Sequence, residues 1–296
     1  MSFSTWDTLF NMLMIAFWFR IWTHDDDRQI HFNPYLGPIA RLSRIVLTFV
    51  EPVFFGLSSR LVALITIGVI ITFRALIAPS EAIWLITLGL EAQPAAPTLV
   101  NRLIFSVLSF GTFLFRLWGI SLLFTWAGAA RSQEHTVSLL HYLSRPFSDT
   151  RIQWRPLILT LYGLLLVVLL DHFGRAVPPN EMRMVLPGGL YWGDGAAVTS
   201  LLKAVILALG AWVQLLPMLQ SLMLMMIIGS WISMFTQSQG LAMLCRDWIN
   251  LLLGPLRRYP VKIGMFDLSP IIFFFAIGIA HTLLMSVIFA AYNTLV

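Results

Sequence analysis

The chain has 296 residues, of which 58% are hydrophobic and 11% are charged, well below the charged share of about 25% that is usual in soluble proteins. This composition excludes a sizeable soluble domain and predicts an integral membrane protein. The formal net charge of +5 does not indicate nucleic-acid binding, because Lys and Arg gather in the cytoplasmic loops of membrane proteins. The single cysteine, Cys245, excludes an internal disulfide and a cysteine-based metal cluster.

Apolar segments long enough to cross roughly 30 Å of hydrocarbon recur along the whole chain. The first, residues 6–22, is expected to be a retained span and not a secretory signal, because no Lys or Arg precedes it. The apolar run 196–235 is too long for one span and contains Pro217. We predict an interfacial or kinked segment to about Leu216 and a span from there to Phe235. The other predicted spans are residues 60–78, 101–127, 156–173 and 269–292.

Three shorter segments place apolar and polar residues at spacings of three and four, a pattern typical of a helix that lies in the membrane interface. They cover residues 38–52, 134–145 and 241–252, and a proline ends each one. The order is therefore span, surface helix, proline, span, three times over. We predict an all-α polytopic membrane protein with about six transmembrane helices. Its single transmembrane domain, residues 1–296, would contain three hairpin-like repeats, at 6–78, 101–173 and 196–292.

A pair of similar hexamers supports this duplication. Residues 17–22 read FWFRIW and residues 113–118 read FLFRLW, so Arg20 and Arg116 hold the same position. Arg116 falls well inside the third span, where a charge is costly unless it is satisfied. It belongs either to an ion path or buried pair, or it reaches the interface or backbone carbonyls as a structural residue. The position of Arg20, at the cytoplasmic end of the first span, favours the structural interpretation.

Basic residues predict the orientation of the chain. The loops that hold the surface helices contain Arg28, Arg41, Arg44, Arg60, Arg131, Arg145, Arg151, Arg155, Arg246, Arg257, Arg258 and Lys262. The opposite loops contain Arg102, Arg175, Arg183 and Lys203. Because Lys and Arg favour the cytoplasmic side, we predict that the surface helices are cytoplasmic and that both termini lie outside.

The most specific motif follows the third surface helix. Ser269 and Pro270 read as the N-cap and first residue of a helix, and Asp267 lies where a carboxylate meets the positive end of that helix. Arg257 and Arg258 would face the headgroups of an anionic leaflet. These structural roles account for every residue of the motif. The functional interpretation is a docking surface for a partner or a specific lipid, with these candidate residues: Arg257, Arg258, Asp267, Ser269 and Trp248. Arg20 and Arg116 are the candidate functional residues inside the membrane.

At these residues the chain resembles the YggT (YlmG) family of small bacterial and plastid membrane proteins. Members look like two copies of a hairpin that carries P-L-R-R, a later proline, and G-G-x-D-x-S-P at the start of a span. The C-terminal copy matches at Pro255, Leu256, Arg257, Arg258, Pro260, Gly264, Asp267, Ser269 and Pro270. The first copy matches at Arg20, Ile21, Trp22, Asn33, Pro34, Glu51 and Pro52. The resemblance is good over residues 215–290, fair over 8–75 and weak between them.

Departures from the family pattern limit this resemblance. The glycine pair is reduced to Gly264, the first copy lacks paired arginines after Pro52, and this chain has an extra hairpin. The resemblance implies no enzymatic activity. It implies a link to the assembly of membrane complexes, such as cytochrome b cofactor assembly in plastids, to osmotic or cation stress, or to nucleoid and division organisation.

No Gly-rich phosphate loop, nucleophile elbow or carboxylate pair occurs in the sequence, so we expect neither an enzyme nor a bound cofactor. The first hypothesis is a scaffold or assembly protein of the bacterial inner membrane that binds anionic lipids and other membrane proteins, or a second copy, but no nucleic acid directly. The second is a cation channel or transporter with a path lined by Arg116, Gln214, Gln220 and Asp171. The third is a haem- or quinone-associated subunit, with His172 and His281 as candidate axial ligands.

Overall fold

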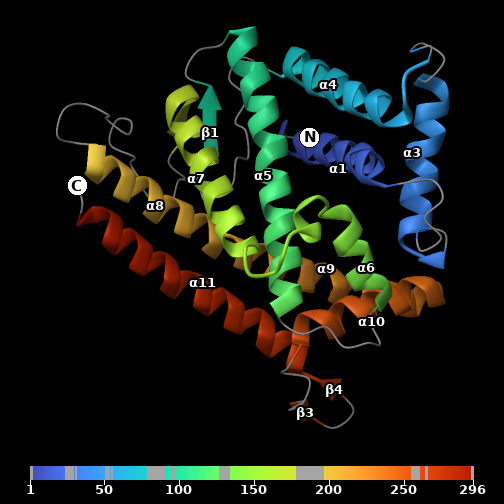
Figure 1. Ribbon diagram of the computed structural model, residues 1–296. Coiled ribbons are helices and arrows are strands. Elements are labelled where there is room, and N and C mark those ends of the chain that lie inside the picture. The colour runs from blue at the N-terminus through green and yellow to red at the C-terminus, as the bar shows by residue number, and fades with distance from the viewer. Residues whose placement is uncertain are drawn as a thin grey trace.

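The computed structural model describes residues 3–23, 30, 32–50, 54, 56–78, 91–94, 98–126, 134–177, 197–254, 261–263 and 266–294. Within these residues the fold is helical, as predicted (Figure 1). The helices are α1 (Phe3–Trp22), α3 (Leu36–Val50), α4 (Ser59–Ile77), α5 (Leu99–Trp126), α6 (Glu134–Leu143), α7 (Arg155–Phe173), α8 (Ala197–Val213), α9 (Leu215–Thr236), α10 (Gln239–Leu253) and α11 (Ser269–Asn293). Two antiparallel ribbons join β1 (Glu91–Pro94) to β2 (Gly174–Val177) and β3 (Lys262–Ile263) to β4 (Phe266–Asp267).

Four helical segments of the described chain are long and apolar enough to cross a membrane: Ser59–Ile77, Leu99–Trp126, Leu201–Thr236 and Ser269–Tyr292. The protein is therefore a membrane protein with several apolar helices. α7 adds a shorter apolar stretch, Arg155–Leu170. α1 is a helix of 20 residues, but polar side chains such as Asp7, Asn11 and Arg20 keep it outside this set. The structure thus supports four of the six predicted spans by length and composition, and the full number stays a prediction.

The long helices pack in pairs that follow the order of the chain. α1 lies against α4, α5 against α7, and α8 and α9 together against α11 (Figure 1). A surface helix, α3, α6 or α10, stands in the sequence between the two members of each pair. Three duplicated hairpins would produce this arrangement, and their common origin stays a prediction.

The first pair of helices crosses α5. Asp7 and Asn11, near the start of α1, both bond to Ser109 of α5. Trp18, toward the end of α1, meets the ring of Phe110, with the ring centroids 6.0 Å apart. A helical stretch of α1 roughly 16 Å long therefore meets neighbouring residues of α5, so the two helices cross and do not run side by side (Figure 1). The sequence pattern does not predict this crossing.

The third unit agrees with one of the two alternatives predicted for it. An interfacial or kinked segment to about Leu216 was expected, followed by a span. α8 and α9 continue one another with a break at Gln214, close to the expected boundary, as the kinked alternative requires. Pro217 lies in the first turn of α9, where its missing N–H leaves no helical bond unmade. α11 pairs with both helices: Gln214 Nε2 lies 3.7 Å from Met285 Sδ, and Gln220 donates to the carbonyl of Phe274 at 3.3 Å.

Glycines allow α5 and α7 to approach closely. A Cβ on Gly111 of α5 would lie 2.9 Å from the hydroxyl of Tyr162, and a Cβ on Gly163 of α7 would lie 2.9 Å from the ring of Phe115. Each helix therefore accepts an aromatic ring of the other at a residue without a side chain. The Tyr162 hydroxyl also donates to the carbonyl of Gly111 at 3.0 Å.

A buried ion pair joins α1, α4 and α5. The side chain of Arg74 is 0% exposed, and its Nη1 lies 3.0 Å from Asp7 Oδ1 and 2.8 Å from Asn11 Oδ1. Its Nε donates to the hydroxyl of Ser106 at 2.8 Å, and its Nη2 donates to the Ser106 carbonyl. The Ser109 hydroxyl donates to the second oxygen of Asp7 at 2.7 Å. The charges are thus paired and hydrogen-bonded inside an apolar chain, as burial requires.

Removal of one partner of this pair is predicted to destabilise the protein. Arg74→Gln or Asp7→Asn leaves the other charge buried without compensation, which costs about 3–5 kcal/mol. The double variant should lose less than the sum of the two single losses, because neither charge remains. The free energy of unfolding in detergent, from a denaturant titration, measures this difference.

Arg41→Gln is the matched control, because Arg41 is exposed on α3 and its loss should leave stability nearly unchanged. Single variants that unfold like the native chain would contradict the structural role of the pair.

Candidate functional site: the surface-helix platform and two cavities

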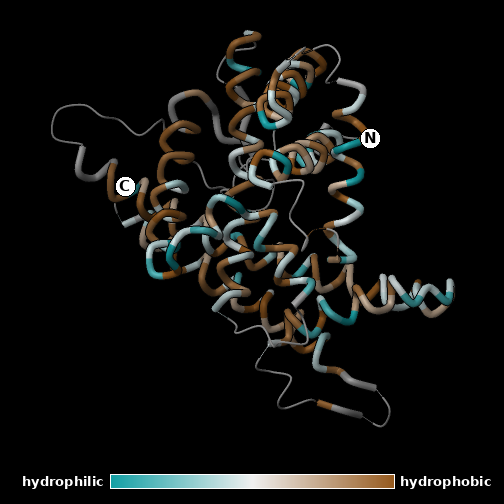
Figure 2. The backbone as a smooth tube through the Cα atoms, turned by 45° about the vertical axis from the view of Figure 1, so that its right-hand side comes forward, coloured by the Kyte–Doolittle hydropathy of each residue, from teal (hydrophilic) through white to brown (hydrophobic). Residues whose placement is uncertain are grey.

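The three surface helices α3, α6 and α10 share one hydrophobic core, and we call them the platform. Figure 2 shows hydrophilic and hydrophobic residues alternating along such helices, whereas the long helices are mostly hydrophobic. The apolar faces turn inward and meet the last turns of α1 and α5, the first half of α9 and one residue of α11 in a single buried cluster. The platform residues of this cluster are Leu36, Ala40, Leu139, Leu140, Tyr142, Cys245, Trp248, Leu251, Leu252 and Leu253.

A short segment before α3 connects all three platform helices. Asn33 Oδ1 accepts the backbone N–H groups of Tyr35 at 2.9 Å and Leu36 at 3.2 Å, which caps the start of α3. Asn33 Nδ2 donates to the carbonyl of His135 in α6 at 2.8 Å. The Tyr35 hydroxyl donates to Asp247 Oδ2 in α10 at 3.1 Å. The Asn-Pro pair before an amphipathic helix was the only sequence signal for this junction, and it did not reveal the long-range contacts.

Trp248 and Ser269 have roles inside the chain. Trp248 is only 9% exposed, and its ring meets that of Phe124, with the centroids 6.0 Å apart. Its candidate role in partner or lipid binding therefore has little surface to act through. Ser269 was predicted to be the N-cap of the last span, but the N-cap is Leu268. The Ser269 hydroxyl instead accepts the backbone N–H of Val261 at 3.0 Å and so closes the loop before α11.

The remaining predicted site residues do not gather into one site among the described residues. Arg257 and Arg258 lie outside the described residues, and Asp267 is described only as part of β4. Arg20 is 9% exposed, and its Nε donates to the hydroxyl of Ser59 at 3.4 Å, which ties the end of α1 to the start of α4. The structure therefore does not bring Arg20 and Arg116 into one site.

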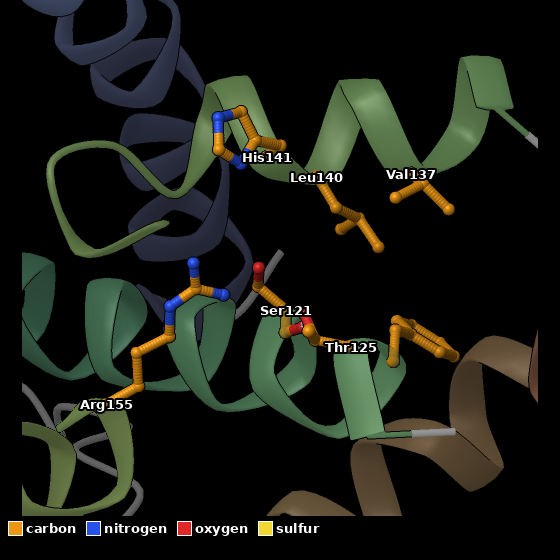
Figure 3. A pocket seen from close by; sticks show the side chains of 7 residues that line it. Ser121, Thr125, Val137, Leu140, His141 and Arg155 are labelled. Atoms are coloured by element: carbon orange, nitrogen blue, oxygen red, sulfur yellow. The ribbon is translucent and has the colours of Figure 1, made fainter. Parts of the chain in front are cut away.

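The first cavity lies between α6 and the ends of α5 and α7 and has a volume of about 380 Å³. In Figure 3, His141, Ser121 and Arg155 gather at one end, and Leu140 and Val137 point from α6 toward α5. Burial lowers the pKa of His141, and the positive charge of Arg145 lowers it further, against the opposing effect of Asp149. The ring of His141 is therefore neutral at pH 7.

Arg155 is held at the edge of this cavity by the backbone. Its Nε donates to the carbonyl of Thr150 at 3.0 Å, and its Nη2 donates to the carbonyl of Ser148. These bonds fix the turn between α6 and α7. The sequence did not suggest this cavity, because its lining residues come from three helices.

The second cavity, of about 360 Å³, lies between α5 and α9. Arg116, Gln214 and Ser221 supply polar groups, and the apolar lining residues are Ile120, Pro217, Met218, Leu222 and Met225. Of the proposed path residues, the structure thus joins Arg116 and Gln214. It places Gln220 against α11 instead, while the side chains of Asp171 and His172 lie outside the described residues.

A comparison with protein families identifies the C-terminal part of the chain. Residues 204–288 match the family described as CCB3/YggT. These residues form a CCB3/YggT domain. The domain contains α9 and α10 with most of α8 and α11, and it confirms the resemblance predicted for residues 215–290. No curated protein and no solved structure matches the chain, so the weaker resemblance of residues 8–75 to the CCB3/YggT family stays a prediction.

The bond between Tyr35 and Asp247 predicts a pH dependence. Burial and then the hydrogen bond to Asp247 raise the pKa of Tyr35 from 10.0 to about 12. A group whose folded-state pKa is raised gives stability that is fully present below its unfolded pKa. This contribution should therefore be intact below pH 10 and be lost as the pH rises from about 10 to about 12.

Tyr35→Phe removes the hydroxyl and should lower stability by about 1 kcal/mol at pH 7, with no loss from this group at alkaline pH. Asp247→Asn keeps an acceptor oxygen without the charge, so it should give a smaller alkaline loss than the native chain. Thermal unfolding between pH 7 and 12 measures both. Identical alkaline profiles for the native chain and Tyr35→Phe would contradict the assignment.

Proposed function

We propose that this CCB3/YggT-domain protein is a scaffold or assembly protein of the bacterial inner membrane. In this proposal its platform faces the cytoplasm, both termini lie outside, and the platform binds another membrane protein beside anionic lipid. The observation that carries the proposal is an exposed apolar tip, formed by the end of α9 and the start of α10.

The tip is a helical hairpin with large uncovered side chains. Met234 and Phe235 are 77% and 88% exposed, and Trp231, Ile232 and Met243 are also exposed. The hairpin itself is close-packed, since a Cβ on Gly229 would lie 2.8 Å from Cys245 Sγ. In Figure 2 this part of the chain projects from the body. A close-packed projection with large exposed apolar side chains on both sides of its polar turn is suited to pack against another protein at the membrane surface.

Polar bonds within the platform connect α10, which contains part of the tip, to the other two surface helices. Tyr35 bonds to Asp247 on α10, and Asn33 bonds to α6, so α10 cannot shift without effects on α3 and α6. This connection supports a role in holding partners at fixed positions. The cavity at Arg116 gives no support to a cation path, because a guanidinium repels cations and no acidic side chain is found among the described residues that line it.

A photo-crosslinking amino acid at Phe235 or Met243 tests the proposal in living cells. We expect both positions to give adducts with the same membrane protein, identified by mass spectrometry, and Phe235→Glu to abolish the Met243 adduct. Leu64, an exposed residue of α4, is the control and should not give this adduct. Adducts with lipid alone at both tip positions would contradict the proposal.

A further inference from the structure

We propose that the cavity between α5 and α9 binds one anionic amphiphile. Its phosphate or carboxylate would lie on the guanidinium of Arg116, and its hydrocarbon chain would follow the methionines of α9. This site is independent of the apolar tip, so either proposal can fail alone.

The first argument is the state of Arg116. Within the part of the chain that the structure describes, its guanidinium makes no hydrogen bond and no ion pair. The carboxylate that acts on it from a distance is that of Asp7, which already pairs with Arg74. A partly buried cation in an apolar membrane segment is costly without a counter-charge. An anion bound in the cavity would offset this cost.

The second argument is the polar groups beside Arg116. Among the described residues, no group bonds to the side-chain oxygen of Gln214 or to the hydroxyl of Ser221, although both line the cavity. Gln214 lies at the break between α8 and α9, where its side chain is held at 3.7 Å from Met285 Sδ. A guanidinium with a hydroxyl and an amide nearby matches the several oxygens of a phosphate or carboxylate.

The third argument is the shape and lining of the cavity, which fit a headgroup and the start of a chain. Its volume of about 360 Å³ is at the lower end of the range for small-ligand sites. Ile120, Met218, Leu222 and Met225 form the apolar part, and Met225 is 58% exposed, so the cavity opens along the outside of α9. Methionine side chains adapt to flexible hydrocarbon.

The fourth argument is depth. Two residues after Arg116, Trp118 stacks on Phe147 with the ring centroids 5.3 Å apart, and Phe147 follows the surface helix α6 closely. Arg116 therefore lies well inside α5, beside the stretch of that helix against which the platform side of the chain packs. If the platform lies on the membrane surface, the long arginine side chain can extend from there toward the level of the lipid phosphates.

Native mass spectrometry of the purified full chain tests the site after detergent exchange removes bound lipid. Phosphatidylglycerol, phosphatidylcholine with the same acyl chains, and inorganic phosphate are added back separately. We expect one phosphatidylglycerol per chain, bound about tenfold or more tightly than phosphatidylcholine. Arg116→Gln should abolish this preference, Arg116→Lys should keep part of it, and Arg41→Gln, which removes an exposed charge of α3, should leave it intact.

Three results would overturn the proposal: an unchanged preference in Arg116→Gln, equal binding of the two lipids, or saturation of the site by inorganic phosphate that displaces phosphatidylglycerol. Gln214→Leu is the second variant, for the case in which Arg116→Gln does not fold. It keeps the guanidinium and should weaken phosphatidylglycerol binding without abolishing the preference. An unchanged affinity in a folded Gln214→Leu chain would remove Gln214 from the site, and with it the proposed geometry.

Discussion

The structure depends on one constraint: a charged side chain inside an apolar chain must find a partner. Arg74 meets this constraint completely, with a carboxylate, an amide and a serine from two other helices. These contacts join α1 and α4 to α5 at the place where the helices cross. We infer that the crossing direction of α1 and α4 is set by the position of Ser106 and Ser109 on α5, which bond to the buried ion pair. Apolar packing is not directional, so by itself it would not select this crossing.

The platform obeys the same constraint with weaker bonds. The side-chain oxygen of Asn33 accepts a bond at the start of α3, and its side-chain nitrogen donates to α6. One amide therefore serves as both acceptor and donor. Tyr35 adds α10 through Asp247. These bonds are directional, whereas the cluster of leucines beneath them is not. The hydrophobic core therefore holds the three surface helices at the end of the bundle, and the polar bonds fix their positions relative to one another.

Periodicity predicted the helical fold, the three surface helices and most long helices, because apolar spacing is a local property of the sequence. It could not predict the Asp7–Arg74 pair, whose members lie far apart in the chain and look like residues at the ends of spans. Trp248 was correctly expected on the apolar face of its helix, but an amphipathic pattern does not say whether protein or lipid covers that face, and here Phe124 does. The boundary within residues 196–235 was predicted at about Leu216, and the helix breaks nearby at Gln214, because the proline that marked it lies in the first turn of the following helix. The resemblance of the C-terminal unit rested on a motif with fixed spacing, and that unit is the CCB3/YggT domain.

Arg20 and Arg116 show why two similar hexamers have different surroundings. Arg20 lies in α1 and Arg116 in α5, the first long helix of each pair. The residue compared below is the one that begins the second helix of the same pair. In the first unit that residue is Ser59, whose hydroxyl accepts a bond from Arg20. In the second unit it is Arg155, another cation, which turns to the carbonyls of Thr150 and Ser148. Among the residues that the structure describes, Arg116 therefore has no hydrogen-bond acceptor, and its guanidinium lines a cavity shared with α9. The residue that begins the second helix thus differs in kind between the two places: Ser59 offers a hydroxyl to Arg20, whereas Arg155 is itself a cation.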